Sequence, residues 1–316
     1  MRRNSPPWWR PRAGRRWRPP APSPAASRIS LAERRPGRLP RGGAGHAARS
    51  PGASCMRRVT IPIRALRRVG TVCLVLALVA PARAAEITLL TTGAYKPVAA
   101  ALVPDFERRT GHTVTIRNDT AGAVAQAIRD GARPDLVVLT PGGFEALIRE
   151  QRLAGGPPVP LAKVGIGVAV RDGAPLPDIA TVAGFREALL RARAVAMVDP
   201  ASGGSSGIYL AQLFARLGIA DAMKGKLVLV RGGLAAARLV TGEADLALQQ
   251  TSELLAVAGA RLVGPIPAEV QNYTVYAGMV PAGAAEPEAA SALLRDLAGP
   301  QAAPVLAGKG MVPPGP

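Results

Sequence analysis

The segment Asp199–Tyr209 joins an apolar stretch to a helical pattern through a run of glycine and hydroxyl residues. Residues 194–198 predict a buried strand, and the apolar residues after the run recur at the spacing of one helix face, closed by Gly218. These apolar residues are Leu210, Leu213, Phe214 and Leu217. At the helix start, unpaired backbone N–H groups and the helix dipole can hold an oxyanion without a cationic side chain. Ser205 is equally well interpreted as an ordinary N-cap, so this segment alone leaves both readings open.

The same order of strand, small-residue turn and helix recurs along the chain. Thr92 and Thr120 lie in two further turns of this kind, and Gln249 and Gln250 follow an apolar strand pattern. Hydroxyls and backbone amides at several converging helix starts would neutralise an oxyanion by hydrogen bonds. Each hydroxyl alone is explained as a cap or turn residue. Lys96 and Arg231 are next to turns and are second-rank candidates, because such cations usually point into solvent.

A serine hydrolase is the alternative that the glycine-rich segment raises. Residues 203–207 satisfy the pattern G-x-S-x-G, with Ser205 as the nucleophile. After residue 84, however, the only histidine is His112, which precedes the serine, whereas that hydrolase fold orders its triad serine, acid, histidine. A phosphate-binding P-loop is excluded, because no glycine turn is followed by the Lys-Ser/Thr pair. One histidine, no cysteine and scattered carboxylates offer no metal-ligand spacing.

The net charge of +19 is concentrated at the N-terminal end of the sequence. Residues 1–84 hold 19 of the 40 basic residues and one of the 21 acidic residues, together with all three Trp and both Cys. Residues 1–55 are rich in Arg, Pro, Gly and Ala, a composition that cannot bury a core. They are interpreted either as a disordered basic arm for nucleic acid or, as we favour, as a stretch ahead of the true start at Met56. The remaining chain is nearly neutral, and no nucleic-acid partner is expected.

An export signal is predicted for residues 56–84. Arginines follow Met56, residues 69–80 are apolar, and Ala82-Arg83-Ala84 has the small-x-small form of a cleavage site. The apolar run is too short for a permanent membrane anchor, which needs about 20 residues. The pattern predicts a periplasmic protein exported by the general secretory route and cleaved near Ala84.

Alternating strands and helices predict an α/β fold with mostly parallel sheets flanked by helices. Expected strands are 86–90, 113–117, 135–139, 164–170, 194–198, 227–230, 244–248 and 273–280. Expected helices include one that ends near Gly111 and is interrupted by Pro104, one at 123–130 and one at 289–297. The predicted organisation is a first lobe at 85–163, a second lobe at 164–271 and a return to the first lobe at 272–316. The hinge is expected near Ala162 and Gln271, and the strand ends face a cleft between the lobes.

Several segments together resemble the periplasmic solute-binding proteins of ABC transporters, of the type that includes the molybdate-binding protein. The likeness covers most of 86–310. Its motifs are Thr-Thr-Gly-Ala at 91–94, Asp-Phe-Glu-Arg-Arg-Thr-Gly at 105–111, the segment 125–136, Asp-Pro through Ser-Gly-Ile-Tyr at 199–209, Gly-Glu-Ala-Asp-Leu at 242–246 and Gly-Pro-Gln-Ala-Ala at 299–303. The resemblance implies a two-lobe type II periplasmic binding protein whose lobes close on a small anion.

The resemblance also implies a set of ligand-binding residues. In that family, serine hydroxyls, backbone amides and a tyrosine bind a tetrahedral oxyanion. This sequence departs from the pattern, with Ala94 and Ala121 at the two serine positions and Gln250 where the tyrosine is expected. The predicted ligand-binding residues are Thr92, Gly93, Ala94, Thr120, Ala121, Ser205, Ser206, Gly207, Gly233 and Gln250.

The sequence therefore predicts a monomeric binding protein that captures a small anion and delivers it to the membrane permease of an ABC transporter. No catalytic residue, cofactor or metal is expected. The ligand is predicted to be either a molybdate-like oxyanion or an organic carboxylate, because threonine and glutamine replace part of the family's set of ligand-binding residues.

Overall fold

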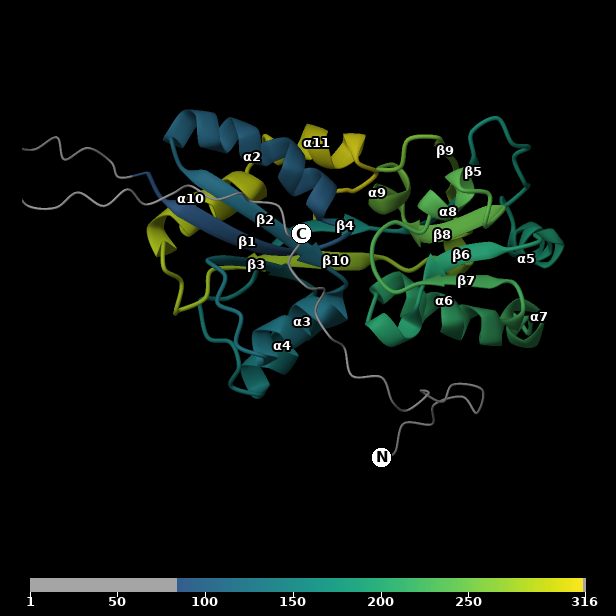
Figure 1. Cartoon of the computed structure of the whole chain (residues 1–316), viewed down its shortest axis with the longest axis horizontal. Coiled ribbons are helices and arrows are strands. Elements are labelled where there is room, and N and C mark those ends of the chain that lie inside the picture. The colour runs from purple at the N-terminus through teal and green to yellow at the C-terminus, as the bar shows by residue number, and fades with distance from the viewer. Residues whose placement is uncertain (1–83, 315–316) are drawn as a thin grey trace, which may run out of the picture. The chain divides into compact units, whose positions relative to one another are not determined.

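The computed structural model describes residues 84–314, which belong to one compact unit, Arg83–Pro316. The basic arm expected at 1–55 and, apart from Ala84, the export signal expected at 56–84 lie outside the described residues. The described chain forms two five-stranded sheets, each with helices on both faces (Figure 1). No helix within 84–314 combines the length and the apolar character that crossing a membrane would demand.

The first sheet has the strand order β2-β1-β3-β10-β4. Its strands are β1 (Glu86–Thr92), β2 (Thr113–Asp119), β3 (Leu136–Leu139), β4 (Val159–Val164) and β10 (Thr274–Met279). Helices α2 (Lys96–Thr110), α10 (Pro287–Ala298) and α11 (Ala302–Gly308) pack on one face, and α3 (Ala121–Arg129) and α4 (Pro141–Arg149) pack on the other. Only β10 runs against the other four strands, in agreement with the expected mostly parallel sheet.

The second sheet repeats this plan with the order β7-β6-β8-β5-β9. Its strands are β5 (Ile166–Arg171), β6 (Val195–Val198), β7 (Leu227–Val230), β8 (Leu246–Gln250) and β9 (Ala260–Pro265). Helices α5 (Val182–Arg191), α6 (Ser205–Arg216) and α7 (Ala220–Lys224) cover one face, and the short helices α8 (Ala237–Val240) and α9 (Thr251–Leu254) cover the other. Here β5 is the reversed strand. Two 3₁₀ turns, η1 (Pro200–Ser202) and η2 (Ala268–Val270), complete the elements.

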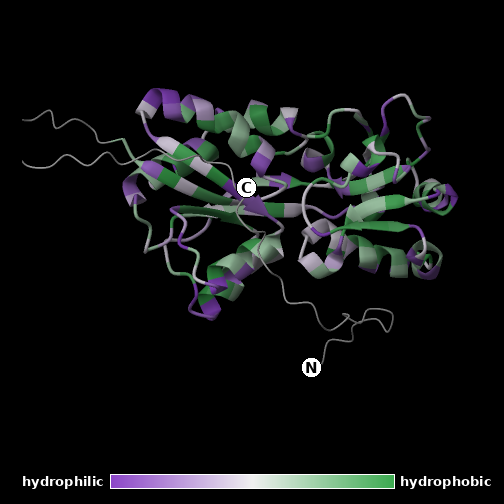
Figure 2. Ribbon diagram, in the orientation of Figure 1, coloured by the Kyte–Doolittle hydropathy of each residue, from purple (hydrophilic) through white to green (hydrophobic). Residues whose placement is uncertain are grey.

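The strands β3 and β6 are apolar along their whole length, and β8 is apolar up to its two terminal glutamines, because helices cover both faces of each sheet. All residues of β3, β6 and β8 are buried, and Figure 2 shows hydrophobic colours along β6. Such continuous apolar runs are typical of strands buried on both sides. They explain why strand positions are readable from the sequence.

Two connections join the sheets. Gly165 alone separates β4 from β5, so the single strand expected at 164–170 is in fact two strands in different sheets. The second connection, at 271–273, leads from η2 into β10. The Gln271 side chain links the two connections, since its Oε1 accepts from the Ile166 N–H (2.8 Å) and its Nε2 donates to the Ile166 carbonyl (2.9 Å). The hinge expected near Ala162 and Gln271 is close to these connections and stays a prediction.

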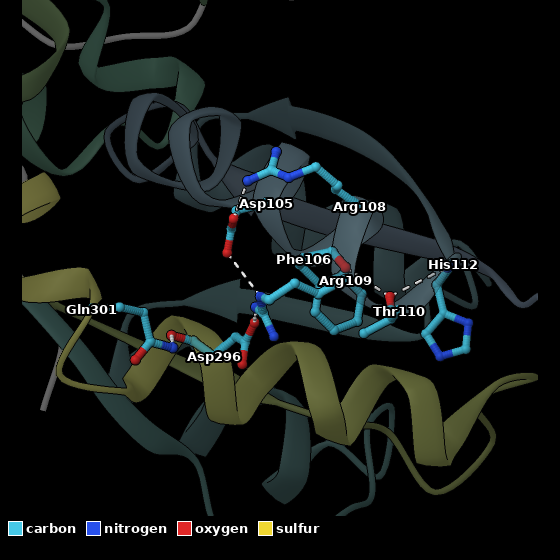
Figure 3. A network of polar contacts seen from close by, with 8 residues as sticks. All are labelled: Asp105, Phe106, Arg108, Arg109, Thr110, His112, Asp296 and Gln301. Atoms are coloured by element: carbon cyan, nitrogen blue, oxygen red, sulfur yellow. Dashed lines mark hydrogen bonds and ion pairs between the residues drawn. The ribbon is translucent and has the colours of Figure 1, made fainter.

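The C-terminal half of α2 is tied to α10 by a polar network (Figure 3). Arg109 forms ion pairs with Asp105, one helical turn earlier, and with Asp296 of α10. The arginine is nearly half exposed, so these pairs stabilise the fold only modestly. Pro104, expected to interrupt this helix, lies inside it, and α2 continues to Thr110 with Gly111 as its left-handed C-cap. Packing of Val98, Val103 and Phe106 into the core maintains the helix despite the proline.

Asp135 connects three segments of the first lobe through its buried side chain. Its Oδ2 accepts from the Thr88 N–H of β1 (2.8 Å), and its Oδ1 accepts from the N–H groups of Ala285 (2.8 Å) and Glu286 (3.0 Å) ahead of α10. The residue is only 4% exposed. Loss of the carboxylate would leave three backbone donors without their partner, which is costly in a buried site.

We expect Asp135→Ala to lower the free energy of unfolding by about 3 kcal/mol, because three buried N–H groups lose a charged acceptor. Chemical denaturation of the purified protein measures this change. Asp130→Ala, at an exposed aspartate after α3, is the control and should change stability by no more than about 0.5 kcal/mol. Equal effects of the two substitutions would contradict the role given to Asp135.

Candidate functional site

The C-terminal ends of four strands converge on one cavity. Thr92 ends β1, Asp119 ends β2, Val198 ends β6 and Gln250 ends β8, and all four line the same space of about 30 Å³. The carboxyl ends of parallel strands are where α/β sheets commonly bind ligands. The full lining is Thr92, Gly93, Asn118, Asp119, Thr120, Ala121, Val198, Gly204, Ser205, Ser206, Gly233, Gln249, Gln250, Glu253 and Tyr276.

Eight of the ten residues expected to bind the ligand line this cavity. Ala94 and Gly207 do not. The Ala94 carbonyl accepts a hydrogen bond from Ser252 Oγ (2.8 Å), and a Cβ at Gly207 would come within 2.2 Å of the Val198 carbonyl oxygen. Gly207 therefore lets α6 pack closely against β6. Lys96 and Arg231, the second-rank candidates, are both exposed and are not part of the lining.

Two hydroxyls of the cavity have no hydrogen-bond partner among the described residues. Thr92 Oγ1 and Ser206 Oγ are both buried, in residues that are 2% and 1% exposed. The N-cap of α6 is Gly204, so Ser205 and Ser206 are the first two helical residues rather than caps. Buried hydroxyls normally find a partner. Ser206 lies in the first turn of α6 and Thr92 at the end of β1, so both hydroxyls are candidates for binding an anion beside the α6 N-terminus.

Direct contacts between the two lobes close the cavity. Thr120 caps α3 by accepting from the Ala123 N–H (3.1 Å) and donates to the Ser202 carbonyl of the other lobe (2.5 Å). The Gly122 N–H donates to the Gly203 carbonyl (3.0 Å). A Cβ at Gly122 would be 2.7 Å from the Gly203 Cα, so backbone meets backbone here. The Thr120 hydroxyl is therefore occupied in holding the lobes together.

Glu253 and Tyr276 are the chemically distinctive residues that the sequence analysis missed. Glu253, in α9, is 7% exposed, and burial raises the pKa of its carboxyl to about 8, although a hydrogen bond from Gln249 acts in the opposite direction. The Tyr276 hydroxyl of β10 accepts a hydrogen bond from Gln250 Nε2 (3.1 Å). Burial and then the negative charge of Glu253 raise the pKa of Tyr276, while the nearby hydroxyls of Ser205 and Thr92 lower it. The site thus contains a carboxyl group that can be neutral near pH 7.

Only one of these two residues lies in a sequence pattern that could have identified it. Glu253 ends the polar run Gln-Gln-Thr-Ser-Glu, which begins with the last two residues of the buried strand β8, and such a run at a strand end is a recognisable pattern. Tyr276 reaches the cavity only because β10 returns to the first sheet beside β3, which requires knowledge of the strand pairing. Sequence reasoning could have found Glu253 but not Tyr276.

The cavity lining contains no Lys, Arg or His, and its titratable residues are Asp119, Glu253 and Tyr276. Within residues 84–314, no cluster of three or more His, Cys, Asp or Glu could hold a metal ion. An anion bound here would depend on hydroxyl and amide donors and on the α6 N-terminus.

The serine hydrolase alternative lacks a histidine base in the described part of the chain. His112 precedes β2 and accepts a hydrogen bond from the Ala85 N–H (3.1 Å), with its ring centroid 5.8 Å from that of Phe106. Asp119, at the other end of this seven-residue strand, lines the cavity, so His112 is roughly 20 Å from it. Ser205 therefore has no histidine within reach.

The free energy of unfolding should fall as pH rises from about 4.5 to about 8, since folding raises the pKa of Glu253 from 4.5 to about 8 and the folded protein then holds the extra proton. We expect the Glu253→Gln variant not to show this fall in the free energy of unfolding, because glutamine does not titrate. The variant should be more stable than the parent by a few kcal/mol at pH 8 and close to it at pH 4.5. Denaturation at both pH values tests this, with exposed Glu145→Gln as the control. If the free energy of unfolding had the same pH dependence in the parent and in Glu253→Gln, Glu253 would not be a buried, neutral carboxyl.

The family described as bacterial extracellular solute-binding protein has a model that matches residues 87–312 of this chain. A curated relative, an aconitate isomerase from a Pseudomonas species, is 33% identical over 233 residues, which are 72% of this chain and 87% of the relative.

Solved structures with the same fold include periplasmic binding proteins. The periplasmic molybdate-binding protein of Azotobacter vinelandii has a TM-score of 0.61 at 21% identity, covering 73% of this chain and 100% of that one. The sulfate-binding protein of Mycobacterium tuberculosis H37Rv has a TM-score of 0.58 at 20% identity, covering 73% of this chain and 88% of that one. These identities show the shared fold alone.

Proposed function

Because the chain belongs to the bacterial extracellular solute-binding protein family, we propose that it captures a small carboxylic acid in the cavity between its sheets and delivers it to an ABC-transporter permease. Export to the periplasm and action as a monomer are part of this proposal. The observation that carries it is the pair of unpartnered buried hydroxyls, Thr92 Oγ1 and Ser206 Oγ, in a cavity at the N-terminus of α6.

A carboxylic acid suits this lining better than a tetrahedral oxyanion such as molybdate. Ala94 and Ala121 stand where the molybdate-binding family has serines, so two expected hydroxyl donors are missing. The aconitate isomerase relative supports the same ligand class, because aconitate is an organic acid.

Entry of the ligand requires the lobes to separate. The cavity of about 30 Å³ has room for only a few water molecules, so a tricarboxylic acid needs more space than this closed form offers. The hydrogen bonds Thr120–Ser202, Gly122–Gly203 and Ser252–Ala94 close the lobes over it. Only the connections at Gly165 and 271–273 join the sheets covalently, so the lobes can open about them.

A panel of aconitate isomers, citrate, propane-1,2,3-tricarboxylate, molybdate, sulfate and neutral sugars tests the proposal by thermal shift. We expect at least one carboxylic acid to raise Tm, because a ligand that binds only the folded state stabilises it. Ser206→Ala should weaken that binding about 10-fold, as expected for a lost hydrogen bond to an anion.

Ser291→Ala is the matched control, since Ser291 is also a helical serine but belongs to α10, outside the cavity. Its ligand affinity should equal that of the parent. Stabilisation by molybdate or sulfate alone, or by sugars alone, would reject the carboxylic acid assignment.

A second candidate function is isomerisation of an unsaturated tricarboxylic acid. It is favoured by the aconitate isomerase relative and by the buried Glu253. A carboxyl with a pKa of about 8 can both take and return a proton near neutral pH. Ionised Glu253 would remove a proton from a substrate carbon next to a carboxylate, the double bond would shift, and the same proton would return at the other end of the three-carbon unit. Nothing else is consumed.

If the protein is an isomerase, it should convert cis-aconitate to trans-aconitate, as followed by proton NMR. We expect Glu253→Gln to lower kcat by at least about 100-fold, because Gln cannot take the proton, while the acid still binds. Glu145→Gln should retain full activity. Binding of aconitate without conversion by the parent protein would leave capture as the function and reject this second candidate.

A further inference from the structure

The carboxyl group of Glu253 lies at the boundary between the two lobes. Glu253 belongs to α9, which follows β8 of the second sheet, while the backbone of Gly93 follows β1 of the first. A Cβ placed on Gly93 would lie 2.7 Å from Glu253 Oε1, so this oxygen rests directly against the opposite lobe. Tyr276, also from the first sheet, lines the same cavity. The burial of Glu253 therefore depends on closure of the lobes.

We infer that Glu253 enters the closed, ligand-bound cleft as a neutral acid, so that capture of the carboxylic acid takes up one proton. This inference rests on the proposed capture of a carboxylic acid, not on the isomerisation, and assigns Glu253 a role in ligand recognition. As a neutral acid, Glu253 supplies an O–H donor to the bound carboxylate, in a lining that has no cationic side chain. An ionised Glu253 would instead repel the ligand at close range in a site of low dielectric constant.

The surrounding charges do not offer Glu253 another partner. Besides Tyr276 and Asp119 in the cavity, the charged residues of the strands that pack against α9 are Arg171 of β5 and Arg261 of β9. Lys96 at the start of α2 and Lys309 at the end of α11 are two further cations of the described chain. Lys96, Arg171 and Arg261 are exposed, and Lys309 is partly exposed. Burial is the leading cause of the raised pKa of Glu253, and the opposing contribution is the neutral amide of Gln249. Protonation is thus the means by which this carboxyl loses its charge.

Proton uptake gives the ligand affinity a defined pH dependence. When the lobes are open, water hydrates Glu253 and favours the ionised form, whereas the closed, occupied cleft favours the neutral form. Binding should therefore weaken as pH rises through the range in which the occupied cleft still holds the proton. Glutamine has the same shape, donates through its amide and does not titrate, so Glu253→Gln separates the charge from the hydrogen bond.

Isothermal titration calorimetry with propane-1,2,3-tricarboxylate and with citrate, between pH 7 and pH 9.5, tests the inference. Neither acid has a double bond to move, so turnover cannot disturb the titration. We expect Kd of the parent protein to rise at least 10-fold over this range, and Kd of Glu253→Gln to change by less than about 2-fold. At pH 8, titration in two buffers of different ionisation enthalpy should show uptake of between about a half and one proton by the parent.

Exposed Glu145→Gln is the control and should keep the pH dependence of the parent. Equal pH dependence in the parent and Glu253→Gln, or binding without proton uptake, would overturn the inference while the proposed function stands. If neither variant nor parent binds any carboxylic acid of the panel at any pH, the proposed function itself fails, and the inference fails with it.

Discussion

The proposed function depends on one constraint: the cavity would have to hold a negatively charged ligand although its lining contains no cationic side chain. The available donors are hydroxyls, amides and the first N–H groups of α6, all at the carboxyl ends of strands from both sheets. Such donors are strong only when water is excluded, because the effective dielectric constant falls on closure. The same exclusion of water makes an ionised carboxyl unfavourable, so one physical condition would both strengthen binding of the proposed anion and favour the neutral form of Glu253.

The strand topology brings residues of both sheets together around this one cavity. Each sheet has a single reversed strand, β10 or β5, and each of these strands follows a connection between the lobes. The chain leaves the first lobe through Gly165 and returns through 271–273. The return brings Tyr276 to the cavity, far along the chain from the other residues of the first lobe. The two covalent connections are adjacent, as the bonds from Gln271 to Ile166 show, which suits rotation of one lobe against the other.

Much of the fold follows from local sequence patterns, whereas the site follows only in part. Buried strands such as β3 and β6 are read from short apolar runs, and the glycine turns mark the starts of helices. The extended stretch at 164–170 hides a change of sheet, because Gly165 breaks no hydrophobic pattern. Thr92, Thr120, Ser205 and Gln250 were predicted from their turns and strand ends. Tyr276 could not be, since only the β3–β10 pairing places it there.

Glycine at the lobe boundary is what permits the burial on which the chemistry depends. Gly122 and Gly203 meet backbone to backbone, and Gly93 leaves room for the Glu253 carboxyl. A side chain at any of these positions would separate the lobes or displace the carboxyl, and water would then reach the cavity. The pKa of Glu253 would fall toward that of an exposed glutamate, because burial is its principal cause. The glycines at the lobe boundary therefore help to set the ionisation state of Glu253, because they allow its carboxyl to be buried.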